Sequence, residues 1–87
     1  MNKKQRKTLE QIFKNPAQSN VKWNDIETLF KGLGAHITPE NGSRVRVELH
    51  GIKAVFHRPH PQRETDKGAL MSVRQFLINA GIDHDEI

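Results

Sequence analysis

Hydrophobic residues recur at helical spacing in two segments of the first third of the chain. From Lys3 to Lys14 this spacing predicts a short amphipathic helix. Asn15-Pro16 should end it, because the residue before a proline is disfavoured in the α region. A second helix is predicted to begin at Asn24, whose side chain can cap the first turn and form a capping box with Glu27. Its buried face is expected to consist of Ile26, Leu29, Phe30 and Leu33, and Gly32 or Gly34 should supply a left-handed exit.

From Ala35 onward the hydrophobic period changes to two, which is typical of β-strands. We expect a short strand over residues 35–38, a turn at Asn41-Gly42, and then two longer alternating strands. A two-residue turn at His50-Gly51 would join these two strands into a hairpin and place Leu49 opposite Ile52. The side of the hairpin that faces the core would then carry Val45, Val47, Leu49, Ile52, Ala54 and Phe56.

The same register predicts a polar and basic opposite side for the hairpin. Its cross-strand pairs would be Glu48 with Lys53, Arg46 with Val55, and Arg44 with His57. The register of the short first strand stays open, because its turn admits more than one loop length. A slip of one residue would exchange the faces of His36 and Ile37, and burial of Ile37 is the natural choice.

The last third of the chain predicts a loop followed by one helix. Residues 58–68 show no apolar period, whereas residues 69–80 have hydrophobic residues at helical spacing and Gly81 as a stop. We therefore predict an α+β fold of the αβββα type, as in double-stranded-RNA-binding domains (dsRBD-like). Two helices would pack on one face of a three-stranded antiparallel sheet, with an extra N-terminal helix. Residues 1–20 would form a basic helical extension, and residues 21–87 the main domain.

Composition narrows the class of protein. A chain of 87 residues with 34% hydrophobic residues can close one small core. The absence of cysteine excludes a disulfide scaffold and a thiolate metal site. No stretch approaches the roughly 18 apolar residues of a membrane span, and the basic N-terminus lacks the apolar run of a signal peptide. The expected location is cytoplasmic, with no membrane partner.

The positive charge is concentrated in the first helices and the hairpin. The net charge is +4. Residues 1–31 carry seven Lys/Arg against three acids, and residues 40–60 carry four against two, whereas residues 61–87 carry three against five. This distribution favours a polyanionic partner such as a nucleic acid, facing the hairpin.

Several short motifs occur in an order that resembles the HicA family of bacterial toxins. After the second helix come a short strand, Asn41-Gly42-Ser43, the hairpin, and Pro59-His60-Pro61. The last are Lys67-Gly68-Ala69-Leu70 leading into Ser72-Val73-Arg74-Gln75-Phe76-Leu77, and the closing Ala80-Gly81-Ile82. The resemblance spans roughly residues 25–82 and depends on order and spacing, because each motif alone consists of common residues.

The resemblance implies the toxin of a type II toxin–antitoxin module. Members bind mRNA through the dsRBD-like domain and cleave it as metal-independent endoribonucleases. A HicB antitoxin silences them by covering the active face. The family's catalytic histidine follows Gly-Ser on the second strand, but here Gly42-Ser43 is followed by Arg44, which stays protonated and suits a phosphate or an oxyanion instead.

A histidine on the neighbouring strand offers a replacement. In the predicted register His57 lies across from Arg44, and His60 follows three residues later. Metal-free RNA cleavage needs a base for the 2′-hydroxyl, an acid for the leaving oxygen and a cation for the phosphorane, and imidazole groups exchange protons near neutral pH. We therefore expect His57, His60 and Arg44 to be catalytic, with no cofactor and no metal. The expected RNA contacts are Arg44, Arg46, Lys53, Arg58 and Lys67.

Structural alternatives stand beside these assignments. His36, His50 and His84 are expected to be solvated polar residues, and His60 could instead fix its loop by bonding to a backbone carbonyl. Lys67-Gly68 is either an anion site or an entry turn, with the turn slightly favoured. Trp23 is expected to contact the second helix rather than stack on a base. The His57-x-x-His60 spacing is weak evidence for zinc, and the basic N-terminus is either a solvated helix face or an extension of the RNA footprint.

Three functional hypotheses follow. The chain could be an active ribonuclease toxin that uses His57 or His60, or a non-catalytic RNA-binding relative that is partnered with a HicB-like antitoxin. A third possibility is a protein-interaction domain whose only partner is the antitoxin. Cleavage of RNA in EDTA would distinguish the first from the second, and loss of all RNA affinity at low salt would indicate the third.

Overall fold

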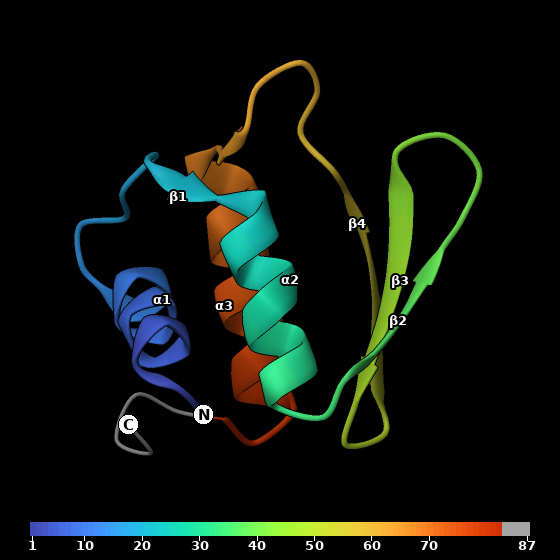
Figure 1. Ribbon diagram of the computed structural model, residues 1–87, viewed down its shortest axis with the longest axis horizontal. Helices are drawn as coiled ribbons and strands as arrows, with labels where there is room; N and C mark the ends of the chain where they lie inside the picture. Colours follow the sequence, from blue (N-terminus) through green and yellow to red (C-terminus); the bar gives the residue numbers. More distant parts are fainter. Residues whose placement is uncertain (83–87) are drawn as a thin grey trace.

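Two central helices separate a third helix from a β-sheet in the computed structural model, which describes residues 1–82 (Figure 1). The central helices are α2 (Trp23–Gly32) and α3 (Lys67–Asn79), and α1 (Lys3–Phe13) lies on their far side from the sheet. The sheet contains β2 (His36–Pro39), β3 (Arg44–Leu49) and β4 (Ile52–His57), all antiparallel, in the order β2-β3-β4. This arrangement confirms the predicted α+β fold, with α2 and α3 on one face of the sheet.

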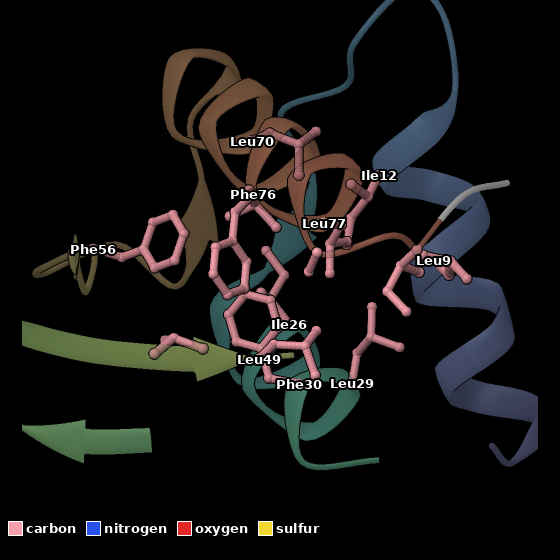
Figure 2. Packing of buried hydrophobic residues seen from close by; sticks show 14 of the residues in the cluster. Leu9, Ile12, Ile26, Leu29, Phe30, Leu49, Phe56, Leu70, Phe76 and Leu77 are labelled. Atoms are coloured by element: carbon pink, nitrogen blue, oxygen red, sulfur yellow. The ribbon is translucent and has the colours of Figure 1, made fainter. Parts of the chain in front are cut away.

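The core lies between the central helices and the inner face of the sheet, and α1 extends it on the other side (Figure 2). The alternation that predicted the hairpin places Val45, Val47 and Leu49 of β3 in this core, all at most 1% exposed. Phe30 of α2 is fully buried at its centre. Aromatic rings from α2, β4 and α3 surround it.

The N-terminal helix is firmly docked rather than appended. Leu9 and Ile12 are fully buried in the same cluster as the central helices. Arg74 of α3 holds the C-terminal end of α1: its Nε donates to the Ile12 carbonyl at 2.8 Å and its Nη2 to the Lys14 carbonyl at 2.8 Å. On the other side, the Gln5 side chain donates to the Thr28 carbonyl of α2 at 3.2 Å. The position of α1 relative to the rest of the fold is therefore fixed by specific contacts.

The hairpin register is confirmed in every pair. Leu49 pairs with Ile52, and Arg44 pairs with His57 at the other end of the ladder. On the other side of β3, Ile37 pairs with Val47. Ile37 therefore faces the core and His36 faces outward, because burial of the apolar isoleucine is favoured over burial of the histidine. Both turn residues of the hairpin, His50 and Gly51, have positive φ values of 52° and 80°, which suits a two-residue hairpin turn.

A second, two-stranded sheet was not predicted. β1 (Val21–Lys22) pairs antiparallel with β5 (Glu64–Thr65), which lies inside the segment interpreted as a loop. Strands of two residues are too short to show a hydrophobic period, so the sequence pattern contains no signal for them. The pairing ties the segment before α2 to the segment before α3.

The predicted cap of the second helix is wrong. The helix begins at Trp23, and its N-cap Lys22 makes no side-chain capping bond. The chain enters α2 directly from β1, and the Trp23 amide donates to the Arg63 carbonyl at 3.0 Å, so strand pairing replaces the capping box. This frees the Glu27 carboxylate for other partners. Trp23 itself is 4% exposed, and its ring contacts that of Phe30 in the second helix, as expected. It is therefore not available as a base-stacking platform.

The final helix begins two residues earlier than predicted. α3 starts at Lys67, and Asp66 caps it by accepting a hydrogen bond from the Ala69 amide at 2.7 Å. Gly81 ends it with a φ of 85°, as predicted.

The interpretation of His50 as a merely solvated residue is wrong, because its Nδ1 lies 2.8 Å from the Ala80 carbonyl oxygen and links the hairpin turn to the end of α3. His84 lies outside the described residues. Across residues 1–82, the longest helices fall short of the length and apolar character needed to cross a membrane.

Candidate functional site

The outer face of the hairpin carries the charged residues that the sequence predicted for it. We call this surface the hairpin face and define it by Arg44, Arg46, Lys53 and His57. All four residues are exposed, and α2 and α3 pack on the opposite side of the sheet (Figure 1). Cross-strand pairing places Arg44 directly opposite His57, and Arg46 lies one row away on the same face. The two strands of the hairpin therefore display three cations and a histidine on one exposed face.

Glu40 holds the two arginines of the hairpin face together. Its Oε2 lies 2.8 Å from Nη2 of Arg46, and its Oε1 lies 3.7 Å from Nη2 of Arg44. The arginine side chains are 53% and 56% exposed, whereas that of Glu40 is 22% exposed. The carboxylate thus sits beneath two guanidinium groups that retain unused N–H donors toward solvent. Two neighbouring guanidinium groups can bind a phosphate that displaces the Glu40 carboxylate or binds alongside it.

The two candidate catalytic histidines lie in different hollows. His57 lines a groove of about 520 Å³ between β4 and α3. His60 lines a separate hollow of about 530 Å³ with Gly42, Ser43, Arg58 and Pro59. Both side chains are exposed, and the Arg58 amide donates to the Ser43 carbonyl at 2.8 Å, which continues the hairpin ladder by one pair. The structure therefore brings Arg44 and His57 together in one cross-strand pair and leaves His60 on the adjoining loop.

Arg58 is engaged in an ion pair. Its Nε and Nη2 donate to the two carboxylate oxygens of Glu27 at 2.7 and 3.2 Å, and the Trp23 indole Nε1 donates to the same carboxylate. The side chain of Glu27 is 14% exposed. This bidentate pair fixes the first residue after β4 against α2, so it positions the loop that carries His60 immediately after His57. Arg58 is thus a structural anchor as well as a predicted RNA contact.

The environment of Glu27 lowers the pKa of its carboxyl. Burial on its own would raise the pKa, but hydrogen bonds from Arg58 and Trp23, together with the positive charges of Arg58 and Lys31, outweigh it and bring the pKa below the ordinary 4.5. Because the folded-state pKa is depressed, the ionised carboxylate stabilises the fold above pH 4.5. That stabilisation is lost as the pH falls through the lowered value.

A glutamine at position 27 tests this anchor. We expect Glu27→Gln to lower the free energy of unfolding at about pH 7 by about 1 kcal/mol, because Arg58 loses a charged acceptor but is exposed enough to be hydrated. Urea titrations at about pH 7 and about pH 3 measure the effect, and the difference between wild type and variant should shrink at the acid pH. A difference that is unchanged between the two pH values would contradict the role of the ionised carboxylate.

The remaining predicted RNA contacts lie apart from each other. Lys53 is exposed on β4, where it pairs with Glu48 across the ladder and belongs to the hairpin face. Lys67 is the exposed first residue of α3, next to β5 rather than on the hairpin. Within residues 1–82, no group of three or more His, Asp or Glu side chains is arranged to hold a metal ion.

Comparison with protein families identifies the region that contains this site. Residues 23–82 match a family model described as HicA toxin of bacterial toxin-antitoxin, which covers more than half of the chain. The chain belongs to the HicA toxin family. Comparisons with curated proteins and with solved structures returned no significant match. The match confirms the resemblance seen in the motif order, and as a member of this family the chain is a toxin component of a toxin–antitoxin system.

The HicA match excludes α1, because it begins at Trp23. It includes the hairpin face, the loop with His60 and the entry to α3. The roles of two residues within it were not predicted from the sequence, namely those of Glu40 beside the arginines and of Glu27, which was assigned to a capping box. Glu40 could have been found by extending the β2–β3 register to its turn, had that register been known from the sequence. Glu27 could not, since its partner Arg58 is distant in the chain and meets it only in the fold.

Proposed function

We propose that this HicA-family chain binds mRNA on the hairpin face and cleaves it as a metal-independent endoribonuclease. The observation that supports this most is the cross-strand pair of Arg44 and His57 on an exposed, cationic sheet face. A guanidinium and an imidazole side by side combine a phosphate ligand with a proton-transfer group. The pair lies next to Ser43, where the family's motif leads one to expect its histidine.

In the proposed reaction, one imidazole removes the proton from a ribose 2′-hydroxyl. The resulting oxygen attacks the adjacent phosphorus, and the bond to the 5′-oxygen of the next nucleotide breaks. A second imidazole acts as the acid and gives that oxygen a proton, so the products are a 2′,3′-cyclic phosphate and a 5′-hydroxyl. His57 and His60 supply the two proton-transfer groups, and Arg44 stabilises the negative charge that develops on the phosphorane.

The direct test is incubation of purified protein with unstructured RNA in EDTA. The proposal predicts fragments with a 2′,3′-cyclic phosphate at one end and a 5′-hydroxyl at the other, which end-group analysis by mass spectrometry identifies. RNA that remains intact, or that is cut only after a divalent metal is restored, would overturn the nuclease mechanism.

A second candidate function is RNA binding without cleavage. It is favoured by one observation, the arginine that stands at position 44 directly after Gly42-Ser43, where the HicA motif has its histidine. In this case the chain would retain RNA on the hairpin face but release no fragments. The EDTA experiment above distinguishes the two candidates, because a binding measurement on the same RNA would then be positive while the fragment analysis is negative.

We further propose that a HicB-like antitoxin is the protein partner and acts by covering the hairpin face. Masking Arg44, Arg46 and His57 would remove both the phosphate ligands and the proton-transfer group in one step. An acidic partner surface suits this role, because it could replace the phosphates that the two arginines bind.

Neutralising Glu40 is expected to strengthen RNA binding. In Glu40→Gln the two arginines lose their carboxylate partner, so a phosphate no longer competes with it, and we expect the affinity for a short RNA to rise several-fold. Fluorescence anisotropy measures the dissociation constant. Glu64→Gln is the matched control, because it changes the net charge equally but lies exposed on β5, away from the hairpin face. Equal gains in both variants would mean that only net charge matters.

A further inference from the structure

A second basic surface lies on α1, outside the part of the chain that matches the HicA family. A groove of about 860 Å³ runs between α1 and the start of α2. Its charged residues comprise five cations and two acids, namely Lys3, Lys4, Arg6, Lys7, Lys22, Glu10 and Asp25. Of the ion pairs formed within residues 1–82, only that of Lys4 with Asp25, at 3.5 Å, involves one of these cations. The groove therefore presents a net positive charge to solvent.

This groove is continuous with the neighbourhood of the hairpin face. A second hollow, of about 720 Å³, shares Lys4, Lys22 and Asp25 with the α1 groove and reaches Arg58 and Arg63. It shares Arg58 and Pro59 in turn with the hollow that contains Ser43 and His60. β1 and the loop between β4 and β5 lie at the same end of the molecule (Figure 1). The shared lining residues show that the three hollows adjoin one another. We call this path the basic track, and its cations are Lys3, Lys4, Arg6, Lys7, Lys22 and Arg63.

We infer that the basic track binds the phosphate backbone of an RNA strand that extends from the hairpin face. This inference rests on the proposed RNA binding and adds the route that the flanking nucleotides take. The track has the property such a route requires, namely spaced cations along a continuous depression. Its exposed lysines and arginines offer charge without aromatic platforms, so it should bind backbone without sequence preference.

The rigid docking of α1 makes the track a fixed surface. Arg74 and Gln5 hold α1 against α3 and α2, and the backbone of α2 approaches α1 so closely that a Cβ on Gly32 would lie 2.6 Å from the Gln5 side chain. The docking of α1 thus determines where its cations lie relative to Ser43 and His60. An RNA bound at the hairpin face must be long enough to reach these cations, so its affinity is expected to depend on its length.

The experiment compares two RNA lengths and two matched variants. Unstructured RNAs of about 4 and about 16 nucleotides span the range of site sizes known for small single-strand-binding domains. Arg6→Gln/Lys7→Gln removes two charges from the track. Lys14→Gln/Lys31→Gln removes two exposed lysines that lie outside it. Dissociation constants are measured by anisotropy at several salt concentrations, with the circular dichroism of each variant as a check of folding.

The track variant should lose affinity on the order of tenfold for the long RNA and almost none for the short RNA. Its salt slope with the long RNA should fall by about 1.4, that is about 0.7 for each lost phosphate contact. The control variant should behave like wild type. An unchanged affinity for the long RNA, an equal loss on both lengths, or an equal loss in the control would each overturn the inference.

Failure of the proposed function would look different. In that case the short RNA would bind the wild-type chain no better than it binds Arg44→Gln/Arg46→Gln, whatever happens to the long RNA. If instead the short RNA binds through the hairpin face and the long RNA gains nothing from α1, the proposed function stands and the track is refuted. An acidic protein as the true ligand of α1 would give this second result.

Discussion

Replacing His57 by alanine is expected to lower the rate of RNA cleavage by about 10²–10⁴-fold, the usual contribution of a positioned acid or base. His57 is exposed at the end of β4, and it is paired with Arg44 rather than packed in the core. Its removal should therefore spare the fold and affect chemistry. The measurement is the single-turnover rate of fragment formation in EDTA with saturating protein, so that a weaker affinity does not obscure the result.

His36→Ala is the matched control for this prediction. His36 is also an exposed histidine on the outer face of the same sheet, but it lies at the other end of β3, opposite Glu48. We expect the His36→Ala variant to cleave RNA at the wild-type rate. Undiminished cleavage by His57→Ala, or an equal loss in His36→Ala, would remove His57 from the mechanism, and His60→Ala would then show whether the loop histidine acts instead.

The largest loss of stability is expected for Phe30→Ala, at about 3–5 kcal/mol. Phe30 is fully buried, and its ring lies 6.4 Å from Trp23, 5.9 Å from Phe56 and 5.6 Å from Phe76, centroid to centroid. Truncation removes a large apolar surface and three aromatic contacts at once, and it leaves a cavity where α2, α3 and β4 meet. The total free energy of unfolding of a domain of this size is about 4–13 kcal/mol, so this substitution would remove a large part of it.

Urea unfolding followed by circular dichroism measures this effect. Ile78→Ala is the control, because it also truncates a large apolar residue but at a position 46% exposed on α3, where we expect a change within about 0.5 kcal/mol. Phe30→Leu should fall between the two and keeps the chain folded if the alanine variant does not. A loss below about 1 kcal/mol for Phe30→Ala would show that α2 is not anchored through this ring.

Local pattern was sufficient for most of the secondary structure. The alternation of Val45, Val47 and Leu49 with charged residues, together with the two-residue turn at His50-Gly51, predicted the strands and every cross-strand pair between β3 and β4. In a hairpin the side-chain period is two and the turn length sets the register, so a one-residue error would bury charges. The pairing of Arg44 with His57, on which the proposed chemistry depends, was therefore available from the sequence.

Contacts between distant segments were not available in the same way. The β1–β5 pairing, the ion pair of Arg58 with Glu27, and the contact of His50 with the Ala80 carbonyl each join residues that no short-range period relates. The capping assignment for Glu27 failed for this reason, because the pairing of β1 with β5 makes the helix begin at Trp23. The Glu27 carboxylate is then not needed at the helix start and binds Arg58, 31 residues away. A polar side chain has several possible partners in sequence, and only packing decides among them.

The basic N-terminal residues illustrate the same division. Their number and charge were evident from the sequence, which predicted a helix with a solvated or RNA-binding face. Only the fold placed Lys3, Arg6 and Lys7 along a groove that continues past Lys22 to the loop of His60. Helical periodicity determines which side chains share one face of a helix, but docking by Leu9, Ile12 and Arg74 determines where that face points. Long-range packing, rather than local propensity, sets the path that a bound strand could follow.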